Sequence, residues 1–291
     1  MDATHTLLAS AIDYAGLFPP AQLGMADAVR NYAEYRRGTD AWALGRFIVP
    51  ANRLDLLALT LKGAPGEADG DPWPLSVLAG PRTADDLEAI RALDGAQLRA
   101  EALEIRASTV DDIRAIAELT GAEYETYVEL PLGSEIPALI ESLASQGLRA
   151  KIRTGGVSAD AFPAADAIVS FIAACLASGV PFKATAGLHH PLRGDYRLTY
   201  EINSATAPMY GYLNMFAATA LLRGGGDTTD AVELLLESDP GALRLEDAGV
   251  IWHDRLIAAD ALAAMRRETM ISFGSCSFRE PLDELAEASA R

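Results

Sequence analysis

Lysine, cysteine and histidine are all scarce in this chain. It contains only two cysteines, Cys175 and Cys276, together with four histidines and three lysines among its 24 basic residues. Two cysteines are too few for a disulfide scaffold, and no Cys-x-x-Cys spacing of a metal or redox centre is present. Acidic residues number 41, and the resulting net charge of −17 disfavours a protein that binds duplex nucleic acid.

Long apolar runs and targeting signals are also few. The segment Met1–Ser10 lacks a basic region followed by an apolar run, so no signal peptide is visible and we expect a reduced, cytoplasmic setting. The longest apolar stretch, Ala164–Val180, contains Asp166 and ends in Ser-Gly. It predicts a buried helix of a soluble domain and no membrane contact.

What is present is a regular alternation of short apolar runs with amphipathic stretches. This pattern is typical of parallel βα units, and 291 residues suit one (β/α)8 TIM barrel that spans 1–291 as a single domain. An open, doubly wound sheet alternates in the same way, but eight strand candidates favour closure. These candidates are Ala9–Tyr14, Arg46–Val49, Leu75–Leu78, Ala100–Ile105, Thr126–Leu130, Leu148–Arg153, Phe182–Thr185 and Ile271–Cys276.

A long insertion separates the last two strand candidates, from about residue 188 to residue 270. It contains three helix-like stretches, Met209–Leu222, Ala231–Glu237 and Ala258–Arg267. Insertions of this kind tend to lie over the active face of a barrel. Its apolar residues predict either a cover over the barrel mouth or a contact between subunits of a homo-oligomer.

The positions of the lysines are the most informative feature. Lys62 ends a predicted helix, where a solvated charge is sufficient explanation. Lys151 and Lys183 lie inside adjacent strand candidates, and alternation places both in the barrel interior with Arg153 and Thr185. Lysine is rarely buried without a purpose, and mutual repulsion together with lost hydration favours a neutral amine. A neutral amine can attack a carbonyl compound to form a Schiff base.

Carboxylates at the strand ends are the predicted proton-transfer groups. Alternation puts Glu101 and Glu104 on opposite faces of their strand, and we favour Glu104 as the acid or base because it is nearer the C-terminal end. Asp13 ends the first strand and is either catalytic or a turn former. The alternative for the lysines is a structural ion pair, with Glu104 or Glu129 as the partner.

Small and polar residues after strands six to eight predict a place for substrate. Loops in this position often bind phosphate in barrels. Adjacent histidines on an extended segment point apart, and no His-x-His spacing accompanies them, so we expect no metal and no cofactor. The candidate substrate-binding residues are Arg153, Gly155, Gly187, His189, His190, Ser275 and Ser277.

Short stretches along most of the chain resemble the deoxyribose-phosphate aldolase branch of the class I aldolases. Lys-Ile-Arg-Thr-Gly at 151–155 resembles the family's Lys-Thr-Ser-Thr-Gly, and Phe-Lys-Ala-Thr-Ala-Gly at 182–187 resembles Phe-Lys-Pro-Ala-Gly-Gly. The paired lysines are the specific part. Shorter matches lie at Ile12–Leu17, Phe47–Pro50, Glu101–Ile105 and Phe273–Ser277.

The resemblance implies a role for each matching residue. Lys151 would be the Schiff-base lysine, Lys183 the cation that lowers its pKa, and Glu104 the proton relay in place of the family's aspartate. Asp13 would match the first-strand aspartate. The residues implied to approach a phosphate are Gly155, Gly187 and either Ser275 or Ser277.

The chain departs from the family in several places. Glu104 is one methylene longer than aspartate, and Gly156 stands where the family has a further lysine. Arg153 replaces a small residue, and we expect it to bring a carboxylate or another anion into the site. Leu-His-His-Pro after Gly187 and the long insertion are foreign to the family. The substrate therefore stays open.

Three functions are consistent with these residues. The first is a Schiff-base lyase that makes or breaks a carbon–carbon bond in a small carbonyl substrate. The second is another barrel enzyme, a hydrolase or isomerase that uses Glu104 with His189 or His190. The third is a barrel that binds a ligand without catalysis.

Overall fold

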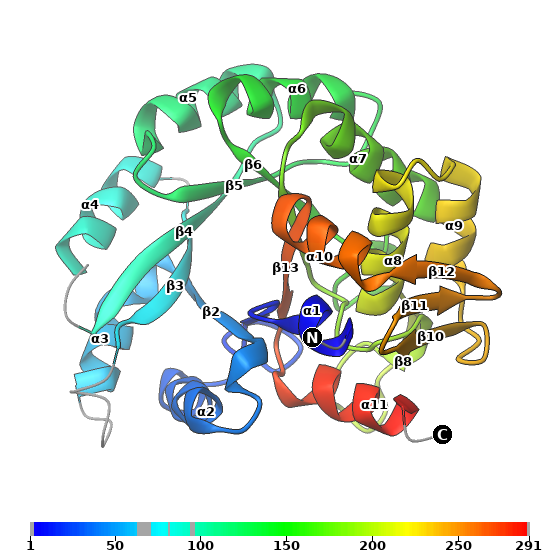
Figure 1. Ribbon diagram of the computed structural model, residues 1–291. Coiled ribbons are helices and arrows are strands. Elements are labelled where there is room, and N and C mark those ends of the chain that lie inside the picture. Colours follow the sequence, from blue (N-terminus) through cyan, green and yellow to red (C-terminus); the bar gives the residue numbers. More distant parts are fainter. Residues whose placement is uncertain (1–2, 63–70, 81, 94–96, 290–291) are drawn as a thin grey trace.

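The computed structural model describes residues 3–62, 71–80, 82–93 and 97–289 and contains a closed barrel of parallel strands. The strands follow the order β1-β13-β7-β6-β5-β4-β3-β2 around the barrel (Figure 1). The predicted (β/α)8 fold is therefore confirmed. The strands are β1 (Ile12–Tyr14), β2 (Leu44–Pro50), β3 (Trp73–Leu78), β4 (Leu98–Arg106), β5 (Glu125–Glu129), β6 (Arg149–Arg153), β7 (Phe182–Thr185) and β13 (Met270–Ser275).

Helices cover the outside of the barrel (Figure 1). Their ends follow the local sequence: Thr109 forms a capping box with Asp112 at the start of α5, and Gly147 ends α6 in the left-handed conformation, at φ 67°. The barrel helices are α2 (Met25–Arg37), α3 (Leu54–Lys62), α4 (Thr83–Leu93), α5 (Val110–Thr120), α6 (Ile136–Gln146), α7 (Ala165–Ser178), α8 (Tyr212–Arg223), α10 (Ala259–Glu268) and α11 (Arg279–Ser289).

Helix α7 carries the apolar stretch noted in the sequence. By length and composition, the segment Ala159–Ser178 is apolar enough to cross a membrane. In the structure, Ile168, Phe171 and Ile172 of this segment are fully buried, and the Phe171 ring packs edge-on against Phe182 of β7. These buried side chains of α7 therefore belong to the barrel's hydrophobic core.

The N-terminal segment differs from the prediction. A short helix, α1 (Ala3–Leu8), precedes β1, and the first strand begins at Ile12 instead of Ala9. Ser10 has a positive φ of 49°, which interrupts an extended chain. The guanidinium of Arg266 then donates hydrogen bonds to the carbonyls of Leu7 and Ala9, which fixes this segment at the base of the barrel.

The insertion before β13 contains strands as well as helices. The sequence predicted helices alone because each strand is only four residues long, too short for a clear alternation. The additional elements are the hairpin β8 (Gly194–Arg197) and β9 (Thr206–Met209), the helix α9 (Thr228–Leu236), and a sheet of β10 (Leu243–Glu246), β11 (Gly249–Trp252) and β12 (Arg255–Ala258).

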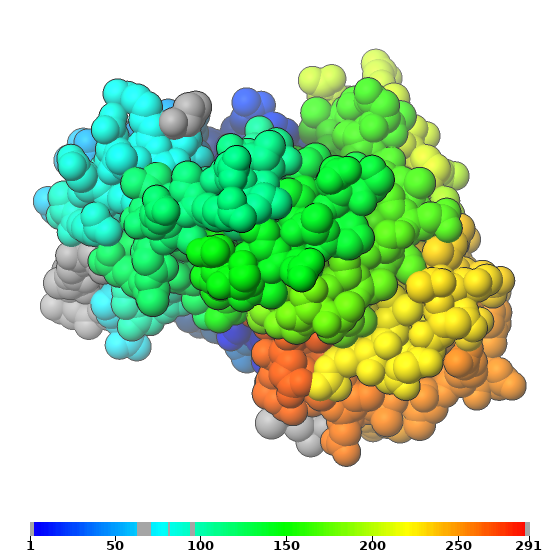
Figure 2. Space-filling model, turned by 90° about the horizontal axis from the view of Figure 1, so that it is seen from above, coloured from blue at the N-terminus to red at the C-terminus, as the bar shows by residue number. Residues whose placement is uncertain are grey.

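The helices of the insertion pack on the barrel. The ring of Tyr212 in α8 stacks on Phe273 of β13 at 5.0 Å between centroids, and Phe216 packs edge-on against the same ring. Tyr212 and Phe216, predicted with Met209 and Tyr210 to cover the mouth or a subunit contact, instead fill the core outside the barrel wall. Met209 does line the cavity at the barrel mouth. Figure 2 shows α9 and the neighbouring sheet, in yellow and orange, as a lobe beside the green barrel helices.

A bulge in β4 changes the direction of one acidic side chain. Leu75 pairs with Ala100 but Ser76 pairs with Ala102, so β4 has one residue more than β3 at this point. Glu101 is the extra residue, and it binds Arg46 at 3.1 Å. Arg46 also binds Glu125, at 2.8 Å, in a charged cluster at the N-terminal end of the barrel. The prediction that Glu101 and Glu104 lie on opposite faces is therefore wrong.

Arg266 provides a test of how the barrel base is held. Its guanidinium donates hydrogen bonds to four carbonyls, those of Leu7 and Met270 at 2.7 Å and those of Ala9 and Ile271. Arg266→Met leaves these acceptors without a donor, and we expect the free energy of unfolding to fall by about 2–4 kcal/mol. Urea denaturation measures this change. The exposed neighbour Arg267 is the control, and an equal loss for Arg267→Met would refute the assignment.

Candidate active site

Strand register places the two interior lysines side by side. Lys151 of β6 pairs with Lys183 of β7, and their neighbours Ile152 and Ala184 are fully buried on the helix side of the barrel wall. Because side chains alternate along a strand, both lysines point inward, as predicted. The exposed fraction is 3 % for Lys151 and 0 % for Lys183.

The Glu104 carboxylate lies between the two lysines. Its Oε2 is 2.6 Å from Lys151 Nζ, and its Oε1 is 2.8 Å from Lys183 Nζ. The hydroxyl of Ser76 donates a further hydrogen bond to Oε1 at 2.7 Å. Each oxygen of one buried carboxylate therefore binds a different lysine.

Asp13 holds Lys183 from the other side. Its Oδ2 lies 2.5 Å from Lys183 Nζ and accepts a hydrogen bond from Ser272 at 2.8 Å. Its Oδ1 accepts one from the backbone N–H of Arg46, also at 2.8 Å. Gly45 leaves room for this carboxylate, because a Cβ there would stand 2.4 Å from Oδ1. Asp13 therefore lies beside the lysines, and both of its carboxylate oxygens accept hydrogen bonds.

Glu129 is the second carboxylate on Lys151. Its Oε2 lies 2.8 Å from Lys151 Nζ, and its Oε1 binds Arg106 at 3.2 Å and Arg153 at 3.3 Å. The sequence suggested Glu129 only as a structural partner for a lysine. The structure places it beside Lys151, where it can also exchange a proton with the amine.

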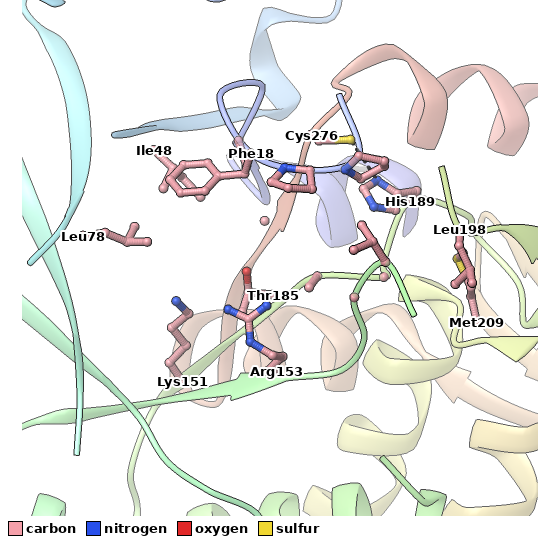
Figure 3. Close-up of a pocket in the computed structure, with 18 of the residues that line it drawn as sticks. Phe18, Ile48, Leu78, Lys151, Arg153, Thr185, His189, Leu198, Met209 and Cys276 are labelled. Carbon is pink, nitrogen blue, oxygen red and sulfur yellow. Dashed lines mark hydrogen bonds between the residues drawn. The ribbon is translucent and has the colours of Figure 1, made fainter. Parts of the chain in front are cut away.

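A cavity of about 280 Å³ opens above Lys151 at the C-terminal ends of the strands. We call it the lysine cavity. Figure 3 shows Lys151 and Arg153 pointing into it, with Phe18, His189 and Cys276 across from them. Lys183 does not reach it. Its lining residues include Phe18, Ile48, Leu78, Glu104, Lys151, Arg153, Gly156, Val157, Thr185, Gly187, His189, Arg197, Leu198, Met209 and Cys276.

The carboxylates decide the charge states of this group. Burial disfavours the ammonium of Lys183, but Asp13 and Glu104 outweigh burial and raise the pKa of Lys183 above its usual value. Burial likewise disfavours the Glu104 carboxylate, but Lys151 and Lys183 hold the pKa of Glu104 well below its usual range. Lys183 is therefore a permanent cation. Its ammonium group forms ion pairs with two carboxylates, those of Asp13 and Glu104, and lies next to Lys151.

The glycines predicted to approach a phosphate have another role. A Cβ on Gly155 would stand 2.5 Å from the Phe162 ring, and one on Gly187 would stand 2.9 Å from it. Both glycines therefore make room for that ring. Gly187, after β7, and Gly156, after β6, line the lysine cavity. Gly155 is not part of the cavity lining.

Ser275 and Ser277 lie beside the cavity and outside its lining. Ser275 Oγ is 3.1 Å from His189 Nδ1, and it accepts a hydrogen bond from the backbone N–H of Ser277 at 3.4 Å. Ser277 Oγ accepts from the backbone N–H of Glu280 at the start of α11. The two serines position His189 and a helix end, and no phosphate role follows from their contacts.

The two adjacent histidines point apart, as expected. His189 lines the lysine cavity, whereas His190 binds the carboxylate of Glu284 at 2.8 Å and stacks on Tyr196. Among the described residues, His190, Glu280 and Glu284 form the group with ligand atoms close enough, within 4.8 Å of one another, to hold a metal ion. This group is outside the cavity lining, so His190 does not join the site.

Cys276 faces the cavity without being activated. Its Sγ lies 3.7 Å from His189 Nδ1 and 3.4 Å from the Tyr200 hydroxyl. Burial raises the pKa of the Cys276 thiol to about 11, so the sulfur stays protonated at neutral pH. Only a thiolate is a strong nucleophile, and Cys276 therefore acts as part of the cavity wall.

Three contributors were missed in the sequence. Ser76 and Ser272 are single hydroxyl residues on the inward phase of apolar strands, and that phase was a usable signal. Arg197 lies in the β8–β9 hairpin of the insertion, where no strand was predicted. Nothing in the local pattern shows that this hairpin reaches the lysine cavity.

The comparisons with known proteins add no relative. Neither a protein-family model nor a curated protein matches the chain. The functional argument therefore depends on the geometry of this site and on the motifs noted in the sequence.

The buried imidazole of His189 gives a pH-dependent prediction. Burial lowers its pKa from 6.5 to about 4. Between these values the unfolded chain binds a proton that the folded protein does not, so stability falls as the pH falls. From pH 7 to pH 4 the parent should lose roughly 3 kcal/mol more than His189→Asn.

Urea titrations at several pH values measure this difference. The exposed His253, whose side chain is 58 % accessible, supplies the control variant His253→Asn. That control should follow the parent. If the stability of His189→Asn changes with pH as that of the parent does, the result contradicts a buried imidazole that stays neutral in the folded protein.

Proposed function

We infer that this protein is a class I lyase of the aldolase type, in which Lys151 forms a Schiff base with a small carbonyl compound. The observation that carries the proposal is that two lysines bind one carboxylate but only one of them has access to a cavity. Lys151 faces the lysine cavity, and Lys183 is sealed behind Glu104. The resemblance to deoxyribose-phosphate aldolases in the stretches around both lysines supports the same assignment.

Lys151 has two carboxylates within reach of its amine, those of Glu104 and Glu129, to take up a proton. A connected set of ion pairs contains four cations and three carboxylates, which leaves one positive charge in excess while Lys151 is protonated. Loss of its proton makes the formal charge of the set zero. The members of the set are Lys151, Lys183, Arg106 and Arg153 with Asp13, Glu104 and Glu129.

The proposed reaction begins with proton transfer from Lys151 to one of its two carboxylates. The free amine attacks the substrate carbonyl to give a carbinolamine, and loss of water gives the iminium ion. The bond between the α and β carbons then breaks, its electron pair enters the iminium as an enamine, and the β-hydroxyl gives up its proton. Protonation of the enamine and hydrolysis return the lysine.

Glu104 is the proposed relay for these protons. It lines the lysine cavity and touches Lys151, so it can exchange protons with both the amine and a bound substrate. The permanent charge of Lys183 on its other oxygen keeps the carboxylate ionised between steps. Asp13, Ser76 and Ser272 do not line the lysine cavity, and they are positioning residues for Glu104 and Lys183.

The Schiff base itself can be trapped. Borohydride added with a panel of small aldehydes and ketones should give a stable adduct, and peptide mass spectrometry should locate it on Lys151. Lys151→Met should abolish the adduct. Lys62, at the exposed end of α3, gives the control Lys62→Met, which should trap like the parent. An adduct that persists in folded Lys151→Met would exclude the assignment.

The relay role of Glu104 predicts a kinetic loss. Glu104→Gln removes the proton acceptor and one negative charge, and we expect the rate of adduct formation at saturating carbonyl to fall about 10²–10⁴-fold. Ser76→Ala removes one hydrogen bond to the same carboxylate and should change the rate less than about tenfold. Rapid-quench trapping measures both rates, and equal rates for the two variants would contradict the relay.

A further inference from the structure

The lysine cavity is positively charged in a strongly acidic protein. Three cations, Lys151, Arg153 and Arg197, line it together with a single carboxylate, that of Glu104. The chain as a whole carries a net charge of −17. A concave surface of opposite sign to the rest of the molecule concentrates anions, because its field is focused by the cavity walls.

Arg197 is held at this cavity by a folded part of the insertion. It ends β8, whose antiparallel partner β9 pairs Arg197 with Thr206. The adjacent Tyr196 stacks on His190 at 3.4 Å between ring centroids, and its hydroxyl donates a hydrogen bond to the carbonyl of Leu192. A small apolar cluster of Leu198, Ala207 and Met209 with Phe162 lies under the hairpin.

Both arginines retain capacity to bind an anion. The Arg153 side chain is 44 % accessible and uses only Nε on Glu129, whose Oε1 it shares with Arg106. Arg197 is exposed and forms no ion pair within the described part of the chain. A guanidinium binds carboxylate and phosphate oxygens through two parallel N–H groups, and these remain available on Arg153.

The glycines and serines expected to approach a phosphate have other close neighbours. The Phe162 ring fills the space over Gly155 and Gly187, the two glycines expected to approach a phosphate. Ser275 and Ser277 are turned to His189 and to the start of α11. In the described cavity wall, Arg153 and Arg197 provide guanidinium groups suited to a negative charge.

We propose that the lysine cavity selects carbonyl compounds that carry an anionic group, held by Arg153 and Arg197 while the carbonyl faces Lys151. The carbonyl end rests on the proposed function, whereas the anion end depends only on the arginines. The anion is a carboxylate or a phosphate ester, which guanidinium groups bind alike. A cavity of about 280 Å³ restricts the substrate to a short carbon chain.

Matched pairs of carbonyl compounds test the selection. Dihydroxyacetone phosphate is compared with dihydroxyacetone, and pyruvate with acetone, at constant ionic strength. The measured quantity is the concentration that gives half-maximal borohydride trapping on Lys151. The parent should need at least tenfold less of the anionic member of at least one pair, and the pair that responds identifies the anion as phosphate or carboxylate.

Arg197→Gln should remove this preference, because the anionic compounds should then need at least tenfold more for half-maximal trapping. Arg244→Gln removes the same charge from β10, outside the cavity, and should behave like the parent. Equal half-maximal concentrations within both pairs, or a preference that survives in Arg197→Gln, would overturn the proposal.

A second measurement separates this proposal from the proposed function. Calorimetric titration with inorganic phosphate and with acetate probes the anion site without any carbonyl. Saturable binding of one of them that is lost in Arg197→Gln supports the anion site even if no compound is trapped on Lys151. Trapping without anion preference, and without binding of either ion, retains the Schiff base and rejects the anion site.

Discussion

The shared carboxylate of Glu104 is the interaction on which the site depends. Two ammonium groups inside a barrel cost several kcal/mol each to desolvate unless they are paired. Glu104 gives one oxygen to each lysine, at 2.6 and 2.8 Å. Removal of that carboxylate would leave two neighbouring buried cations on β6 and β7, so the paired lysines and Glu104 form one unit.

The surrounding residues complete the pairing. Asp13 binds Lys183, Ser272 and a backbone N–H of β2, and Gly45 leaves the space that this carboxylate occupies. Glu129 forms the corresponding ion pair with Lys151. The result is one sealed lysine with a fixed charge and one lysine at a cavity. This difference in access, more than simple repulsion between the lysines, separates their chemical roles.

Strand phase made much of the site predictable from the sequence. Lysines in Arg-Ala-Lys-Ile-Arg and Phe-Lys-Ala-Thr face inward because alternation puts them opposite the apolar Ile152 and Ala184, which pack on the helix side. The same argument fails at Glu101, since the extra residue in β4 reverses the phase and no local signal marks the bulge. Periodicity also cannot show which carboxylate reaches which lysine, because that depends on register across the barrel.

The insertion was the least predictable region. Its strands are four residues long, and Arg197 reaches the lysine cavity from a hairpin held by tertiary contacts such as the stack of Tyr196 on His190. Likewise, the glycines after β6 and β7 match an anion-binding pattern, but Phe162, distant from Gly187 in the sequence, occupies their space. The motifs around the two lysines predicted where these side chains lie, whereas the glycine motif did not predict the contact with Phe162.

Exchange of the carbonyl oxygen tests the central claim most directly, because a Schiff base replaces that oxygen with nitrogen and returns an oxygen from water. A ketone labelled with ¹⁸O, dihydroxyacetone phosphate or pyruvate, is incubated with the protein, and loss of label is followed by mass spectrometry. The account predicts faster loss with the parent than with Lys151→Met, whose rate should equal that of buffer. Equal acceleration by both proteins would contradict Lys151 as the amine.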